Sequence, residues 1–135
     1  MKHRMQIANP LNWAKPKGYN NGVILSGSRM LFVAGQVAWD EQQRIVGKGD
    51  FAAQFHQALK NVRTVVEAAG GKVEDVGRLT IYVTDMKAYG EQLRDVGAYY
   101  KEVFSYHYPA MALIKVAGLL EDDAMVEIEA TAVLE

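Results

Sequence analysis

One apolar segment, Met30 to Trp39, constrains the fold of this chain more than any other feature. Apart from Gly35 and Gln36, all of its residues are hydrophobic, and no polar alternation interrupts it. A strand of this kind is usually buried on both faces. A chain of 135 residues is about one domain long and can enclose a core of its own. The fold must therefore supply a cover for both sides of this strand.

The N-terminal region predicts a β-hairpin. The short apolar run Val23–Leu25 is followed by the turn signal Ser26–Arg29 and then by the strand Met30–Trp39. Ile45–Val46 is predicted to add one more short strand. Residues 1–18 are broken by two prolines, and we expect them to form an irregular arm.

Two amphipathic helices follow. Apolar side chains recur every three or four positions from Phe51 to Ala69 and again from Met86 to Phe104. Asp50 is a favourable N-cap for the first helix, and Gly70–Gly71 provides its stop. Gly97 interrupts the second helix at a cost of about 1 kcal/mol relative to Ala, as does a second glycine seven residues before it. Such glycines either allow close packing of the backbone or leave room for a ligand.

Three further strands are predicted at Leu79–Val83, Ala110–Val116 and Met125–Val133. The order β-β-(β)-α-β-α-β-β predicts a single α+β domain over residues 1–135, with both helices on one face of a mixed sheet. Two helices cover only one face of a sheet. The second face of the apolar strand therefore needs another copy of the chain, which predicts a homo-oligomer.

Composition narrows the possible functions. The chain has 15 Lys and Arg against 16 Asp and Glu and a net charge of −1, so it lacks the basic surplus of nucleic-acid-binding proteins. It has no cysteine, which excludes disulfides and thiol chemistry. The longest uncharged stretch, Val103–Ile114, is shorter than the ~20 residues of a membrane helix. We expect a cytoplasmic protein with no membrane and no nucleic-acid partner.

Few residues are candidates for catalysis. The three histidines lack metal-ligand spacing, and no phosphate-binding glycine loop or nucleophile elbow is present, so no metal or cofactor is predicted. Glu127 and Glu129 are two residues apart in the last strand and point to the same face. At an interface, a carboxylate is costly unless it is paired or protonated. Glu127 is therefore either a general acid or base, or part of a polar face or an intersubunit salt bridge.

Three segments resemble the RidA/YjgF family, the reactive intermediate deaminases that are also labelled endoribonuclease L-PSP. They are Phe32–Gln36, Tyr82–Met86 and Val126–Val133, and the resemblance extends from Tyr19 to Val133. It implies a chorismate-mutase-like α+β fold and a homotrimer whose sheets surround a central barrel, with three clefts between subunits. Typical members hydrolyse enamines and imines of 2-amino acids to 2-oxo acids and ammonia, without a cofactor.

The same resemblance implies roles for individual residues. The residue that matches Glu127 holds and activates a water, the backbone at Gly35 and Leu113 contacts the ligand, and Tyr19 lines the cleft. Met111 stands where the family has an arginine that binds the substrate carboxylate. Methionine has no donor for a carboxylate, and leaving a buried charge without its partner costs roughly 3–5 kcal/mol.

The leading hypothesis is therefore an enamine or imine deaminase, a hydrolase that acts on a small metabolite other than the standard 2-imino acids. Met111 and Leu113 would form an apolar wall of its cleft. The alternative is a non-catalytic trimer that binds a metabolite or a partner protein. A ribonuclease is a third interpretation, and both the charge balance and the lack of paired histidines oppose it.

Overall fold

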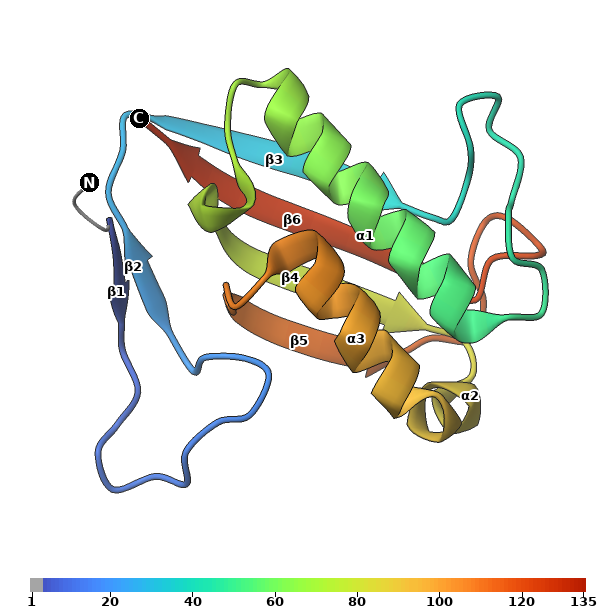
Figure 1. Ribbon diagram of the computed structural model, residues 1–135, viewed down its shortest axis with the longest axis horizontal. Coiled ribbons are helices and arrows are strands. Elements are labelled where there is room, and N and C mark those ends of the chain that lie inside the picture. Colours follow the sequence, from blue (N-terminus) through green and yellow to red (C-terminus); the bar gives the residue numbers. More distant parts are fainter. Residues whose placement is uncertain (1–3) are drawn as a thin grey trace.

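The main sheet is organised around its last strand, β6 (Val126–Leu134). The computed structural model describes residues 4–135. In it, β6 lies between β3 (Arg29–Gln36) and β4 (Val76–Val83) and runs antiparallel to both. The edge strand β5 (Ala110–Lys115) pairs with β4 in parallel. The strand order β3-β6-β4-β5 therefore makes a mixed sheet (Figure 1).

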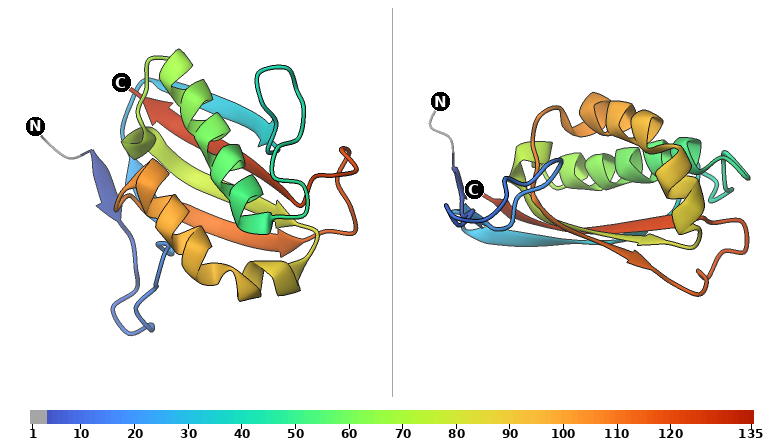
Figure 2. Two further views of the ribbon diagram at one scale, coloured as in Figure 1. Left: turned by 45° about the vertical axis from the view of Figure 1, so that its right-hand side comes forward. Right: turned by 90° about the horizontal axis from the view of Figure 1, so that it is seen from below.

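The two faces of β6 differ in chemistry. Buried and half-buried residues alternate along its whole length. The even-numbered side chains from Val126 to Leu134 are buried in the core, and the odd-numbered ones from Glu127 to Val133 point to the opposite face. Figure 2 shows all the helices on one side of the sheet. We call the other side, which carries no helix in residues 4–135, the open face.

Two main helices cover the buried face. α1 (Phe51–Ala68) packs on β3 and β6, and α3 (Leu93–Phe104) packs beside α1. The short α2 (Met86–Glu91) precedes α3, and a 3-10 turn at Val73–Asp75 leads into β4. The side chain of Asp50 accepts a hydrogen bond from a backbone N–H in the first turn of α1, so the predicted N-cap is confirmed. The predicted α+β arrangement, a mixed sheet with two helices on one face, is confirmed as well.

The predicted hairpin is wrong. β2 (Val23–Leu25) pairs with β1 (Met5–Ile7) in a separate two-stranded sheet, whereas β3 pairs with β6. The reason lies in the connection between β2 and β3. Any side chain at Gly27 would overlap the carbonyl oxygen of Leu134, and Ser28 N–H donates to that oxygen at 2.9 Å. The chain therefore closes against the end of β6 and does not fold back on β2.

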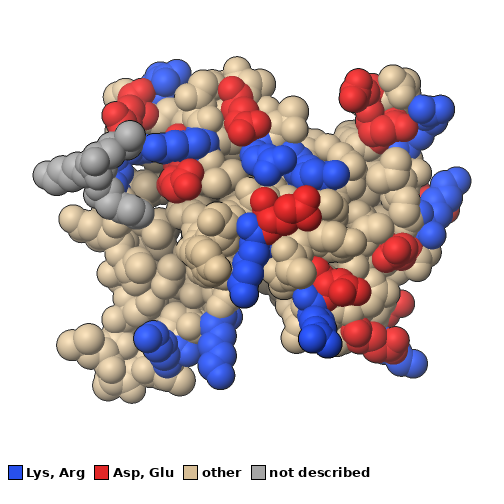
Figure 3. Space-filling model, in the orientation of Figure 1, with Lys and Arg blue, Asp and Glu red and all other residues tan. Residues whose placement is uncertain are grey.

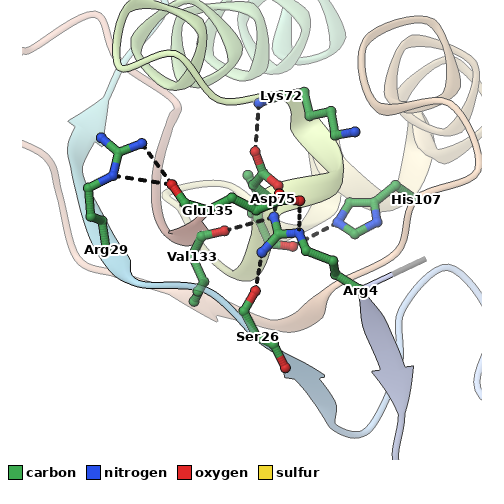
Figure 4. Close-up of polar contacts among 9 residues, drawn as sticks. Arg4, Ser26, Arg29, Lys72, Asp75, His107, Val133 and Glu135 are labelled. Atoms are coloured by element: carbon green, nitrogen blue, oxygen red, sulfur yellow. Dashed lines mark hydrogen bonds and ion pairs between the residues drawn. The ribbon is translucent and has the colours of Figure 1, made fainter. Parts of the chain in front are cut away.

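The N-terminal arm, predicted as irregular over residues 1–18, contains the strand β1. Arg4 fastens this strand to the body of the protein (Figure 4). Its guanidinium pairs with the buried Asp75 and donates to the carbonyl oxygen of Val133 at 3.1 Å. A strand of three residues is too short to show alternation, so no sequence pattern indicated it. Residues 1–3 lie outside the described part of the chain.

Two smaller predictions also differ from the structure. The helix predicted over Met86–Phe104 is divided at Gln92 into α2 and α3. The side-chain oxygen of Gln92 accepts from the N–H of Ala52 at 2.7 Å and so helps to cap α1. The strand expected at Ile45–Val46 is a single bridge between Ile45 and Trp39.

Within one chain, β3 is covered on one face only. Val33 is buried under α1, but Met30 and Phe32 on the open face are 61% and 73% exposed. The interpretation of Met30–Trp39 as a strand buried on both faces therefore requires a cover from outside the chain. A second copy of the chain in this place stays a prediction.

Gln54 is a fully buried polar side chain that ties three segments together. Its amide nitrogen donates to the backbone carbonyl oxygens of Asp123 at 2.9 Å and Gly47 at 3.3 Å. Its side-chain oxygen accepts from the backbone N–H of Met125 at 2.8 Å. Gln54→Leu removes these three hydrogen bonds to part-buried backbone groups, and we expect the free energy of unfolding to fall by about 2–4 kcal/mol. Urea denaturation measures it. The control Gln57→Leu, whose amide bonds only within α1, should cost under about 1 kcal/mol, and equal losses would contradict this role.

Candidate functional site

A cavity of about 480 Å³ lies on the buried face of the sheet, between α3 and β5. The loop at residues 17–19 closes one side of it. In Figure 3 the surface is hollowed between this N-terminal loop and α3, and basic side chains stand on both sides of the hollow. The residues that line the cavity are mostly apolar or aromatic, and they are Lys17, Gly18, Tyr19, Phe55, Ile81, Tyr89, Leu93, Val96, Gly97, Tyr100, Lys101, Tyr108, Met111 and Leu113.

One face of α3 forms the wall opposite β5. Its lining residues Leu93, Val96, Gly97 and Tyr100 follow the spacing of three and four that places side chains on one side of a helix. A Cβ built at Gly97 meets no atom within 4 Å. The backbone at Gly97 is therefore not closely packed, and the absence of a side chain there leaves space in the cavity.

Two stacked tyrosines form a rigid part of the cavity wall. The rings of Tyr100 and Tyr108 are 5.2 Å apart and nearly parallel, and the Tyr100 hydroxyl donates to the carbonyl oxygen of His107 at 2.6 Å. Burial, with a smaller contribution from Tyr108, raises the pKa of Tyr100 far above its usual value. This phenol therefore stays protonated and acts as a fixed wall of the cavity.

Backbone pairing places Tyr19 beside β5. Asn20 forms a parallel bridge with Ala110, and its N–H donates to Pro109 at 3.2 Å. The Asn20 side chain also donates to the carbonyl oxygen of Tyr108 at 2.6 Å. These contacts fix the loop at the start of β5, where Met111 lies in register with Leu79 of the buried face.

Glu127 lies on the open face of the sheet. Glu127 is paired in register with Tyr82 of β4. The residues before and after Tyr82 in the sequence are buried under the helices, so Tyr82 and Glu127 point to the opposite face. The backbone of Gly35 lies directly against the Glu127 carboxylate, since any Cβ there would overlap it. The pairing of β3 with β6 shifts register between Val33 and Gln36, which brings this glycine to Glu127.

Tyr82 extends this polar cluster. Glu129 and Glu127 are two negative charges close to its hydroxyl. Partial burial and then the two carboxylates raise the pKa of Tyr82 above its usual value, because both disfavour the phenolate. Tyr82 is therefore a neutral hydrogen-bond donor beside the acidic pair.

The structure separates the site residues predicted from the sequence into two groups. Tyr19, Met111 and Leu113 line the cavity on the buried face. Gly35 and Glu127 lie together on the open face. A single chain therefore does not bring the proposed water-activating carboxylate to the cavity.

Other features considered from the sequence take no part in either group. Trp13 is 60% exposed and does not line the cavity. The ring of His107 is buried with Nε2 2.7 Å from the carbonyl oxygen of Val76, and the ring of His56 stacks on Tyr99. In residues 4–135 no group of three His, Asp or Glu side chains is suited to a metal ion. Over the same range no helix has the length and hydrophobicity to cross a membrane.

Comparison with known proteins identifies the family. The sequence model described as endoribonuclease L-PSP matches residues 12–134. This chain belongs to that family, the RidA/YjgF family. A RutC family protein of Pyrococcus horikoshii is 35% identical over 92% of this chain and 94% of its own length. The 2-iminobutanoate/2-iminopropanoate deaminase of Salmonella typhimurium is 37% identical, over 85% of this chain and 86% of its own.

A solved structure supports the same assignment. The crystal structure of a Rid family protein of unknown function from Yersinia pestis superposes with a TM-score of 0.87 and 33% identity. The match covers 97% of this chain and 99% of the other. This member of the RidA/YjgF family therefore shares its whole fold with a solved relative.

Sequence reasoning did not identify several residues of the cavity. Lys17, Tyr100, Lys101 and Tyr108 line it although none was a candidate. For the residues of α3 a signal was present, because positions 93, 96, 97, 100 and 101 share one helix face. The loop residues 17 and 108 carried no such signal, since only the tertiary fold brings them to β5.

The contact between Gly35 and Glu127 yields a direct test. Gly35→Ala should displace the Glu127 carboxylate from its place, because the new methyl group overlaps it. A crystal structure of the variant measures the displacement. Gly90→Ala is the matched control, since its Cβ meets no atom within 4 Å and should leave Glu127 in place. An unmoved Glu127 in Gly35→Ala would contradict the close contact.

Proposed function

We propose that this protein is a cofactor-free enamine or imine hydrolase that acts as a homotrimer, with its substrate in clefts between subunits. One observation carries the proposal: the cavity and Glu127 lie on opposite faces of the same sheet. A complete site then needs the cavity of one copy and the open face of another. The deaminase name of the Salmonella relative supports the reaction class. A metabolic enzyme of this kind fits the cytoplasm.

The open face is suited to a second copy. It exposes Met30 and Phe32 on β3, and Ile114 on β5 is 42% exposed. Uncovered apolar side chains of this size mark an interaction surface. Glu127 lies on the same face, so a contact between copies through this face also brings a carboxylate to the interface.

The chemistry assigned to Glu127 is general acid–base catalysis. An enamine first tautomerises to its imine. As water attacks the imine carbon, its proton passes to the Glu127 carboxylate, while the imine nitrogen takes up a proton from the solvent. The resulting carbinolamine then collapses to a carbonyl. Its hydroxyl gives its proton to the solvent, Glu127 returns its proton to the departing nitrogen, and ammonia leaves. Imine and water are thus converted to a ketone and ammonia, and no cofactor is needed.

Met111 directs the choice of substrate. It lines the cavity where the family resemblance implies a carboxylate-binding arginine, and it offers no donor. Its neighbour on the same face of β5, Leu113, is apolar as well. We therefore infer that the substrate is a metabolite other than the standard small 2-imino acids.

A non-catalytic binding protein is the second candidate, because no carboxylate lines the cavity within one chain. If the open face met something other than a second copy, the cavity would bind a metabolite without turning it over. The family label also raises ribonuclease activity. The described histidines, His56 and His107, do not support it, since both rings are engaged in packing or hydrogen bonding.

The homotrimer leads to a test of the open face. Multi-angle light scattering at micromolar concentration should give about three times the chain mass of 15.0 kDa. Phe32→Asp places a charge on the apolar part of this face and should shift the mass toward the monomer. Trp13→Asp, at another exposed aromatic position in the N-terminal loop, is the matched control. A wild-type monomer would contradict the proposal.

The catalytic role of Glu127 leads to a second test. An amino-acid oxidase generates 2-imino acids in place, and semicarbazide trapping reports their disappearance. Glu127→Gln removes the base and should lower turnover at least about 100-fold while the oligomer persists. Unchanged turnover would refute the role. Met111→Arg should increase the hydrolysis of small 2-imino acids, because it adds a charged partner for their carboxylate.

A further inference from the structure

We propose that the cavity is built for 2-imino acids with a large, aromatic side group, with the ring inside and the carboxylate at the mouth beside Lys17 and Lys101. The binding mode is inferred from the cavity alone. The statement that the bound molecule is hydrolysed rests on the proposed function.

The size of the cavity argues for a bulky ligand. Its volume of about 480 Å³ lies in the range of roughly 300–1,000 Å³ that is typical of sites for drug-sized molecules. An imino acid with a side group of one or two carbons would leave much of this space to water. The apolar wall formed by Ile81, Leu93 and Met111 cannot satisfy the hydrogen bonds of that water.

The lining argues for an aromatic ring. Tyr19, Phe55, Tyr89, Tyr100 and Tyr108 all line the cavity. Rings at 4.5–7 Å from one another attract by stacking or by edge-to-face contact. The near-parallel stack of Tyr100 on Tyr108 already shows this geometry and offers a fixed surface to a ligand ring.

The charged residues of the lining indicate that the anionic end of the ligand lies at the mouth of the cavity. Lys17 and Lys101 are the charged residues of the lining, both are exposed, and no Asp or Glu accompanies them. Among residues 4–135 neither lysine is held in an ion pair. The Lys101 ammonium lies 6.0 Å from the ring of the exposed Tyr106, which places it at the outer rim. A carboxylate at this position needs no arginine at residue 111.

Gly97 is the specificity-determining position on α3. It lies on the helix face that lines the cavity, and any larger residue there would extend into open space. A glycine inside a helix is destabilising, so its presence at this point is not explained by helix stability. Its effect is to keep the cavity wide enough for a ring.

Three matched probes test the binding mode by isothermal titration calorimetry. Phenylpyruvate, the 2-oxo acid that such a hydrolysis would release, carries both the ring and the carboxylate. Pyruvate lacks the ring, and phenylacetone lacks the carboxylate. We expect phenylpyruvate to bind at least about tenfold more tightly than pyruvate, because only its ring fills the apolar cavity. Equal affinity for the two acids, or no binding of phenylpyruvate, would overturn the proposal.

Two sets of variants locate the ring and the carboxylate. Gly97→Leu fills the cavity and should weaken phenylpyruvate binding at least about tenfold. Gly90→Leu, a helical glycine outside the cavity, should leave it unchanged. Both substitutions favour helix, so loss of folding does not explain a difference. Unchanged affinity in Gly97→Leu would overturn the assignment of the ring.

The double variant Lys17→Gln, Lys101→Gln should bind phenylpyruvate about fivefold more weakly than the wild type, since exposed ion pairs contribute modestly. Its affinity for phenylacetone should be unchanged. Lys15→Gln is the control outside the lining. Equal affinity of the double variant and the wild type for phenylpyruvate would overturn the position of the carboxylate.

The proposed function can fail separately. If phenylpyruvate binds as described but the imine of phenylalanine is not hydrolysed faster than in buffer, the hydrolase proposal fails and the cavity assignment stands. If 2-imino acids with methyl and benzyl side groups are hydrolysed equally well, the hydrolase proposal stands and the cavity assignment fails.

Discussion

The alternation along β6 is the constraint on which the rest of this structure depends. Because β6 lies in the centre of the sheet, its buried side chains fix which face of β3 and β4 receives the helices. The same alternation sends Glu127 and Glu129 to the face without helices. A change of register by one residue would bury both carboxylates under α1 and expose the apolar set, so the register is strongly specified. The fold and the position of the acidic pair therefore have one physical cause.

In our account, this division separates substrate binding from acid–base chemistry. The cavity, with Tyr19, Met111 and Gly97, is built from the helix side of the sheet. The carboxylate of Glu127 is held on the open face against the backbone of Gly35. In our account, association of copies brings the two parts together, and the sheet itself sets their relative geometry. The substrate preference can then change through α3 and the N-terminal loop without disturbing the acid–base group.

Strong local patterns made much of the fold predictable. The periodicity of α1, its cap at Asp50 and the alternation of β6 were read correctly, since each is set by neighbouring residues. The hairpin was wrong because the close contact of Gly27 with the end of β6 depends on residues more than 100 positions apart. The break at Gln92 was missed, and the side chain of this residue caps a different helix, a tertiary contact that local periodicity does not show. For the site, the family resemblance pointed to Tyr19 and Met111, but Lys17 and Tyr108 reach the cavity only through tertiary structure.

The most direct test of a site shared between copies is complementation between two variants. Glu127→Gln keeps the cavity and lacks the carboxylate, whereas Gly97→Leu keeps the carboxylate and has its cavity filled. Each variant alone should hydrolyse the imine of phenylalanine slowly. Trimers assembled from equal amounts of both should regain about one quarter of the wild-type turnover, because in that share of clefts two intact parts meet across an interface. Turnover in verified mixed trimers that stays at the level of the separate variants would contradict a shared site.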